Sequence, residues 1–273
     1  MKGLHINGSE VYQRDVATLR KYRDDYYKIT LHKQIRRAGY EAIEGDPSGK
    51  RETGKKNTAG NEAKLEQSLS RTRATIFELA ICNDWEWFVT LTLNPEYHDR
   101  SDLNNYKKKL SIWLKNYNRL HHTNICYLLI PEQHSDGRNW HMHGLMMGIP
   151  EEHLQEFTEQ KRLPIKILIE IKRGHKVYNW PAYQRTFGYI SISKIRHIES
   201  VSRYITKYIT KDLAKTAIGL NNHLFYSSKI LKRAETIYQG QLTREMKEDY
   251  SNEYVKIKTV KSFEEAIQYF VDG

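Results

Sequence analysis

The sequence is poor in cysteine and has no long apolar run. Its two cysteines, Cys82 and Cys126, lie far apart and match neither a disulfide framework nor the Cys/His spacing of a structural zinc site. We therefore expect both to be core residues in a reducing compartment. No stretch approaches the roughly 20 apolar residues of a membrane span, and charges stand where a signal peptide would have its apolar segment. These absences predict a cytoplasmic protein with no membrane partner.

A phosphate-binding loop of the ATPase kind is also missing. Gly49–Lys55 has the spacing G-x-x-x-x-G-K, but Lys56 stands where the magnesium-binding Ser or Thr is required. Such a loop also needs a buried strand before it, and here the preceding residues are polar. The match is therefore rejected.

Basic and aromatic residues are abundant instead. The chain of 273 residues has a net charge of +11, with 19 tyrosines, five tryptophans and 39% hydrophobic residues. That apolar content is sufficient for a folded core. The positive charge makes a polyanion such as nucleic acid the simplest partner, although charge alone is weak evidence.

Three regions can be distinguished along the chain. Residues 1–60 are expected to be a charged helical extension, with apolar positions at helical spacing between Ser9 and Arg37, followed by a flexible linker at Gly45–Asn61. Residues 61–215 are expected to be the main domain, which should fold without the extension. Residues 216–273 form a C-terminal α/β extension, with a strand near Tyr254–Ile257 and a helix at Ser262–Phe270.

The main domain alternates between helical and strand patterns. Helices are expected at 61–81, 103–120, 151–160 and 199–213, and strands at 85–94, 125–131, 140–148, 165–171 and 188–195. Antiparallel strands with helices packed against them predict an α+β domain.

A His-x-His pair lies on one of these strands. His141 and His143 are two residues apart, so both imidazoles project from the same face. The turn-rich segment HSDGRN joins this strand to the preceding one, which ends in PEQH and can bring Glu132 close. Two imidazoles and a carboxylate make an open site for a divalent ion. An isolated pair of this kind is more often a plain strand feature, and Gln133 or His134 could replace Glu132 as ligand.

A tandem repeat, YITKYITK, occupies Tyr204–Lys211 on the last predicted helix. Tyr204 and Tyr208 are four residues apart and share a helical face, with Lys207 and Lys211 beside them. A phenol can attack phosphorus and leave a DNA strand esterified to the protein. The alternative is a helix that packs Tyr and Ile inward with solvated lysines.

The ordered set of these segments resembles the three motifs of HUH rolling-circle replication initiators. The set consists of FVTLTLN at Phe88–Asn94, PEQH followed by WHMHG, and VSRYITKYITKD at Val201–Asp212. The resemblance covers about residues 68–215. It implies that His141 and His143 are metal ligands, because the family's middle motif is His-hydrophobic-His, and that Glu132 is the acidic ligand.

The resemblance leaves the nucleophile open. Two-tyrosine members have Tyr-x-x-x-Tyr, which Tyr204 and Tyr208 match, whereas single-tyrosine members have Tyr followed three residues later by Lys. Both repeats satisfy the second pattern too, through Lys207 and Lys211. Val201, Tyr204 and Lys207 fit the family's Val-x-x-Tyr-x-x-Lys pattern, which favours Tyr204.

The same resemblance implies a fold and an activity. The fold would be a central five-stranded antiparallel sheet with flanking helices, and the ion would be Mg²⁺ or Mn²⁺. The substrate would be single-stranded DNA at a replication origin, nicked to give a 5′-phosphotyrosine and a free 3′-hydroxyl and then rejoined. Such a phage or plasmid protein would act in the cytoplasm of a bacterial host, with a host helicase and polymerase as partners.

Other functions remain open. A conjugative relaxase or an HUH transposase would use similar chemistry, although relaxases usually have three metal-binding histidines and a tyrosine near the N-terminus. Here the tyrosines follow the histidines. A non-catalytic DNA-binding regulator would account for the charge and the aromatic residues through phosphate contacts and stacking. It would leave the His and Tyr pairs unexplained.

Overall fold

The computed structural model describes residues 12–13, 15–33, 36–37, 62–158, 163–210, 213–214 and 223–270. The chain divides into two compact units, Asn61–Lys232 and a second unit made from Met1–Gly60 together with Arg233–Gly273. Each has its own hydrophobic core. No helix in the described ranges is both long enough and apolar enough to cross a membrane.

The larger unit alternates helices and strands. Its helices are α1 (Glu62–Ile81), α2 (Leu103–His121), α3 (Ile165–Lys172), α4 (Pro181–Thr186) and α5 (Ile198–Ile205), with 3-10 turns η2 (Glu151–His153) and η3 (Thr206–Tyr208). Its strands are β5 (Trp87–Thr92), β6 (Cys126–Gln133), β7 (Trp140–Met147), β8 (Gln155–Glu156), β9 (Val177–Asn179), β10 (Ile190–Lys194) and β11 (Tyr226–Ser227).

One antiparallel sheet organises this unit. Within the described residues it has seven strands in the order β11-β6-β7-β5-β10-β9-β8. This confirms the α+β class. The number differs from the five strands that the resemblance implies, because β11, β9 and β8 add short pieces of two or three residues at the edges.

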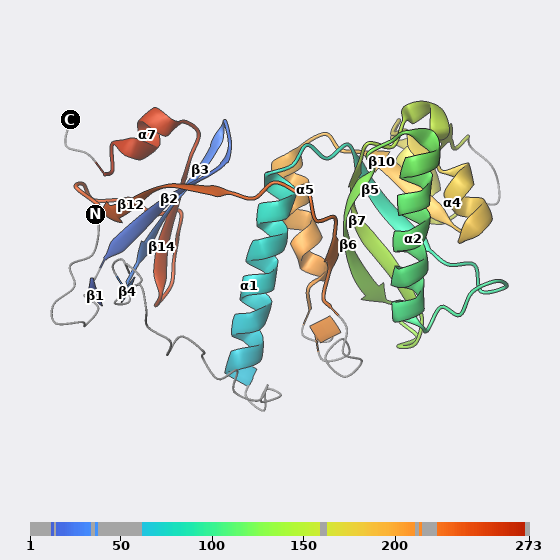
Figure 1. Ribbon diagram of the computed structural model, residues 1–273, viewed down its shortest axis with the longest axis horizontal. Coiled ribbons are helices and arrows are strands. Elements are labelled where there is room, and N and C mark those ends of the chain that lie inside the picture. The colour runs from blue at the N-terminus through green and yellow to red at the C-terminus, as the bar shows by residue number, and fades with distance from the viewer. Residues whose placement is uncertain are drawn as a thin grey trace, which may run out of the picture. The chain divides into compact units, whose positions relative to one another are not determined.

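The two faces of the sheet carry different side chains. Strand alternation in β5 places Trp87, Val89 and Leu91 on one face, and α2 packs there (Figure 1). The other face carries Phe88 and Thr90, and α1 and α5 lie on that side (Figure 1). The face toward α5 is therefore the one available for chemistry.

Three elements differ from the sequence-based expectation. Residues 165–171 form helix α3 and not a strand: the I-x-I-x-I alternation suits a strand, but Ile167, Leu168 and Ile171 are half-buried at helical spacing. The helix expected at 151–160 is only η2 followed by β8. The helix expected at 199–213 is α-helical to Ile205 and continues as η3.

The smaller unit is built on a second antiparallel sheet. Its strands are β2 (Val16–Arg23), β3 (Tyr26–His32), β12 (Glu235–Gln241), β13 (Tyr250–Ser251) and β14 (Val255–Val260), in the order β12-β2-β3-β14-β13, and its helix is α7 (Phe263–Ile267). A separate pair joins β1 (Tyr12–Gln13) to β4 (Arg36–Arg37). Ala17, Leu19 and Ile29 are fully buried against α7 residues such as Ala266.

The N-terminal helix expected between Ser9 and Arg37 is therefore wrong. The segment contains β-branched and aromatic residues in two runs, separated by Asp24 and Asp25, and it folds as the β2–β3 hairpin. The outer partners of this hairpin, β12 and β14, lie more than 200 residues away in sequence. The linker at Gly45–Asn61, with the rejected loop match at Gly49–Lys55, lies outside the described residues.

The C-terminal limit of the larger unit also differs from the expected residue 215. Strand β11 pairs with β6, and Ser228 Oγ accepts from the backbone N–H of Tyr127. Asn83 holds Lys232 by two hydrogen bonds, accepting from its N–H at 2.9 Å and donating to its carbonyl at 3.1 Å. These contacts tie the chain to the larger unit as far as residue 232.

This division predicts different behaviour for two truncations. A fragment of residues 61–232 should be soluble and unfold cooperatively, since its core is complete. A fragment of residues 61–273 should aggregate, because β12 and β14 would lose their β2 and β3 partners and expose open edges. Size-exclusion chromatography and thermal unfolding of both would check this. A longer fragment that stays as monomeric as the shorter one would contradict it.

Candidate active site

The β6–β7 hairpin is closed by a tight, internally bonded turn. Asp136 Oδ1 accepts from the backbone N–H groups of Arg138 and Asn139, both at 2.9 Å, and these bonds lower the pKa of Asp136 to about 2. Gly137 has φ of +67°, a conformation that glycine adopts readily. At Gly144 a side chain would collide with the backbone of Leu128 on β6. Local chemistry therefore fixes the hairpin register.

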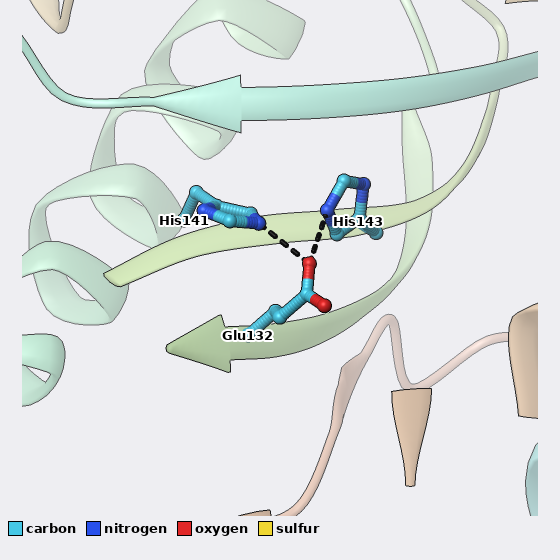
Figure 2. Close-up of side chains that lie close together, drawn as sticks. All are labelled: Glu132, His141 and His143. Carbon is cyan, nitrogen blue, oxygen red and sulfur yellow. Dashed lines mark hydrogen bonds and ion pairs between the residues drawn. The ribbon is translucent and has the colours of Figure 1, made fainter. Parts of the chain in front are cut away.

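That register brings Glu132, His141 and His143 together. Glu132 lies directly opposite His141, and His143 is two residues further along the same face of β7. Glu132 Oε2 lies 2.6 Å from His141 Nε2 and 2.7 Å from His143 Nε2 (Figure 2). One potential ligand atom from each residue lies within 4.8 Å of the others. The sequence-predicted triad is thus assembled, and it could hold a divalent ion.

The donor set suits such an ion. Two imidazole nitrogens and one carboxylate oxygen leave further positions for water or phosphate oxygens. Burial, followed by the neighbouring His141, lowers the pKa of His143 to about 4 despite the opposing effect of Glu132. The ring is therefore neutral near pH 7, the form that binds metals.

Thr90 orients His143 from the adjacent strand. It lies opposite His143 in the β5–β7 register, with its Oγ1 3.1 Å from His143 Nδ1. A hydroxyl can donate to this nitrogen or accept from it. It can therefore accept the Nδ1 proton when Nε2 binds a metal, which is the usual way a ligand histidine is oriented.

The two alternative ligands named from sequence are engaged elsewhere. Gln133 donates to the Gly137 carbonyl, and His134 Nε2 lies 2.7 Å from a guanidinium nitrogen of Arg100. The His134 ring packs edge-on against His141, with centroids 4.4 Å apart. Arg100 and His134 thus support the triad from the side.

Paired isoleucines anchor the tyrosine segment. Ile205 and Ile209 are buried in the core, each one residue after a tyrosine of the repeat. Arg73 on α1 donates to the Ile209 carbonyl through Nη2 at 2.8 Å and Nε at 3.1 Å. Burial of the isoleucines turns Tyr204 and Tyr208 toward the open face of the sheet.

Both tyrosines lie beside the triad, in unequal positions. The Tyr208 ring stacks on His143, with centroids 4.4 Å apart and planes 12° from parallel. Tyr204 is 45% exposed and packs edge-on against Phe88. The two hydroxyl oxygens are 3.1 Å apart. Tyr204 and Tyr208 thus form a hydrogen-bonded pair with one member next to a potential metal ligand.

The surroundings of the pair differ as well. Burial raises the pKa of Tyr208 well above its usual value, and the hydrogen bond to Tyr204 and the negative charge of Glu132 act in the same direction. Lys207 places its Nζ 5.4 Å from the centre of the Tyr204 ring. Lys211, the other lysine of the repeat, lies outside the described residues.

Sequence reasoning missed Thr90, Phe88, Arg73 and Arg100. The signal for the first two was present, because alternation in WFVTLT places Phe88 and Thr90 on the face of β5 opposite the buried Val89 and Leu91. Arg73 and Arg100 gave no signal, since their partners lie on distant segments.

The comparisons with known proteins bear on this same segment. No curated protein and no solved structure matches the chain. Residues 86–213 match the sequence model of one family, described as replication-associated protein ORF2 and its equivalents. The match covers slightly less than half of the chain, from just before β5 to just after the tyrosine repeat, and it includes the triad and both tyrosines. Over the residues that build the candidate site, the chain is similar to replication-associated proteins.

Proposed function

We propose that this protein is a rolling-circle replication initiator of the HUH type, which nicks single-stranded origin DNA with a tyrosine and a divalent ion. The observation that carries the proposal is the meeting of the Glu132, His141 and His143 triad with two tyrosines on one sheet face. The family match supports a role in replication. The catalytic domain would lie within residues 61–232.

The proposed reaction is a transesterification. The phenolic oxygen of a tyrosine attacks the scissile phosphorus, and the bond from phosphorus to the 3′ oxygen breaks. The tyrosine loses its proton and the departing 3′ oxygen gains one, so no proton is consumed overall. The products are a 5′-phosphotyrosine and a free 3′-hydroxyl that can prime synthesis. One phosphoester replaces another, so the reaction can run backward and rejoin strands.

The side chains have separate roles in this proposal. Glu132, His141 and His143 would hold Mg²⁺ or Mn²⁺, which would polarise the scissile phosphate. Tyr204 would be the first nucleophile. Its hydroxyl can donate a hydrogen bond to that of Tyr208, which orients the attacking oxygen.

Lys207 would stabilise negative charge near the Tyr204 phenol and the substrate phosphate. Lys211 would add to this positive charge. Unwinding would fall to a host helicase and extension of the 3′ end to a host polymerase, in the cytoplasm of a bacterial cell.

An adduct assay tests the function. The protein would be incubated with a pool of single-stranded oligonucleotides of random sequence, with Mn²⁺ or EDTA, and adducts resistant to SDS would be isolated. We expect adducts only with Mn²⁺, with a 3′-end label retained on the protein and a 5′-end label on a released fragment that a polymerase can extend. A label attached the other way round would contradict the proposed polarity. Binding without any adduct would favour the non-catalytic regulator.

The same assay bears on the competing nucleases. Relaxases and HUH transposases also form tyrosine adducts, so the adduct alone leaves them open. Repeated turnover on a circular single strand that carries the selected site, with release of closed circles, is expected of an initiator.

Thr90→Val should weaken metal binding without removing a ligand. Valine preserves the shape but lacks the hydroxyl that meets His143 Nδ1, and lost partners of this kind typically cost about 10- to 100-fold in metal affinity. Calorimetric titration with Mn²⁺ would measure the change. Thr72→Val is the matched control, since it also removes a threonine hydroxyl bond, to the Ser68 carbonyl on α1. Equal affinities for the wild type and Thr90→Val would contradict the role of Thr90.

A further inference from the structure

A groove runs along the open face of the larger unit, starting at the triad. It consists of two adjoining hollows of about 480 and 840 Å³, which share Phe88, Glu170, Ser193 and Tyr204 in their lining. The smaller hollow reaches His143 and Tyr208, and the larger one leads away to the residues that follow β10. Helix α3 lines one side and α5 the other.

The floor of the groove follows from strand alternation. In β10, Ile190 and Ile192 are buried on the α2 face, so Ser191 and Ser193 point to the opposite face. Register places Ser191 beside Thr90 and Ser193 beside Phe88. Small hydroxyl side chains at these positions leave the space between α3 and α5 unfilled.

The lining is strongly basic. Seven of its side chains are Lys or Arg, and Glu170 is the one acidic residue among the lining residues described. The basic residues include Lys166 and Arg173 from α3 or its end, Arg203 and Lys207 from α5 and η3, and Lys194 and Arg196 at the end of β10. This charge is complementary to a phosphodiester chain.

One arginine is held in place by a relay. His175 Nδ1 donates to Glu170 Oε2 at 2.6 Å, which leaves Nε2 free to accept, and Arg196 Nη1 lies 3.1 Å from it. The Arg196 guanidinium is therefore fixed by one nitrogen while its others remain available. A pre-oriented guanidinium is well suited to bind a phosphate.

We propose that this groove binds the single-stranded DNA on one side of the scissile phosphate, with Arg196 contacting a backbone phosphate. The position of the scissile phosphate rests on the proposed function. The committed ligand is single-stranded because Phe88 and the exposed Tyr204 ring offer aromatic faces in the lining, which unpaired bases can reach.

The first test measures binding in EDTA, so that cleavage plays no part. Arg196→Gln should weaken binding of a fluorescent single-stranded oligonucleotide about tenfold, and it should reduce the slope of log K against log salt by about 0.7, the value for one lost phosphate contact on a single strand. Arg119→Gln is the matched control, because this exposed arginine lies on α2 at the opposite face of the sheet. Equal effects of the two substitutions, or an equal loss for duplex DNA, would overturn the proposal.

The second test fills the groove without changing charge. Ser193→Leu should weaken binding, with Ser111→Leu on α2 as the bulk control and thermal unfolding to verify both folds. With an oligonucleotide that carries the selected nick site, removing nucleotides from one side should cost affinity in the wild type and not in Ser193→Leu. Unchanged binding by Ser193→Leu would refute the groove assignment even if nicking proceeds. Groove-dependent binding without any adduct would refute the nuclease function alone.

Discussion

His143→Ala is expected to lower metal-dependent nicking by roughly a thousandfold, since a bound ion contributes several kcal/mol and each ~1.4 kcal/mol is a factor of ten. His143 is half of the histidine pair, and its Nε2 lies 2.7 Å from the carboxylate of Glu132. Binding of single-stranded DNA should survive, because lysines and arginines supply most phosphate contacts. Single-turnover cleavage and fluorescence anisotropy on the same oligonucleotide would measure the two properties separately.

Two variants make this test decisive. Glu132→Gln keeps the size of the side chain and removes its charge, so it should also lose nicking while unfolding at nearly the same temperature as the wild type. His121→Ala removes an exposed histidine at the end of α2, away from the site, and should nick normally. Undiminished nicking by His143→Ala, or nicking by the wild type in EDTA, would remove the metal triad from the mechanism.

The hairpin was predictable because every determinant is local. Strand alternation places His141 and His143 on one face, and the Asp136–Gly137 turn fixes which residue of β6 meets them. The tyrosine pair was predictable from its spacing for the same reason. Its placement over His143 was not, because it depends on burial of Ile205 and Ile209 under α1.

The N-terminal segment shows where local reasoning fails. Between Val16 and His32 the charged residues permit an amphipathic helix, and nothing within the segment identifies the partners that make it a sheet. Those partners are β12 and β14, which register pairs such as Arg20 with Thr236 bring in from the far end of the chain. Such long-range pairing overrides local helix propensity.

The groove was out of reach for a related reason. Residues 165–171 alternate apolar and polar types, which suggested another strand, and a strand there would provide no wall. As a helix, α3 places Lys166 and Arg173 along the groove and leaves Ile165 and Ile169 exposed. One wrong element therefore concealed a whole surface, whereas the triad did not depend on it.

The two tyrosines are expected to divide the work, because their surroundings differ. A uniform helix would separate them by about 5.4 Å along its axis, but the change to a 3-10 turn at Thr206 accompanies hydroxyl oxygens only 3.1 Å apart. Tyr208 is stacked on His143, and burial raises its pKa, so its ionisation is disfavoured. Tyr204 is exposed beside Lys207. Tyr204 should therefore attack first.

Phenylalanine substitutions test this order, since they remove one oxygen and preserve the ring packing. Tyr204→Phe should lose first-strand cleavage almost completely. Tyr208→Phe keeps the stack on His143 and loses one hydrogen bond, worth about 0.5–1.5 kcal/mol, so first cleavage should fall at most about tenfold. Its defect should appear in strand transfer, measured by offering a second oligonucleotide to the preformed adduct, because no second phenol remains to attack.

The double variant decides whether tyrosine chemistry operates at all. Tyr204→Phe with Tyr208→Phe should bind single-stranded DNA and form no adduct, whereas Tyr189→Phe, an exposed tyrosine outside the site, should behave as wild type. If Tyr208→Phe is the single change that stops first cleavage, the order is reversed. The buried phenol would then have to ionise beside Glu132, which requires a cation in the triad to offset the carboxylate charge. An adduct that survives the double change would exclude both tyrosines as the nucleophile.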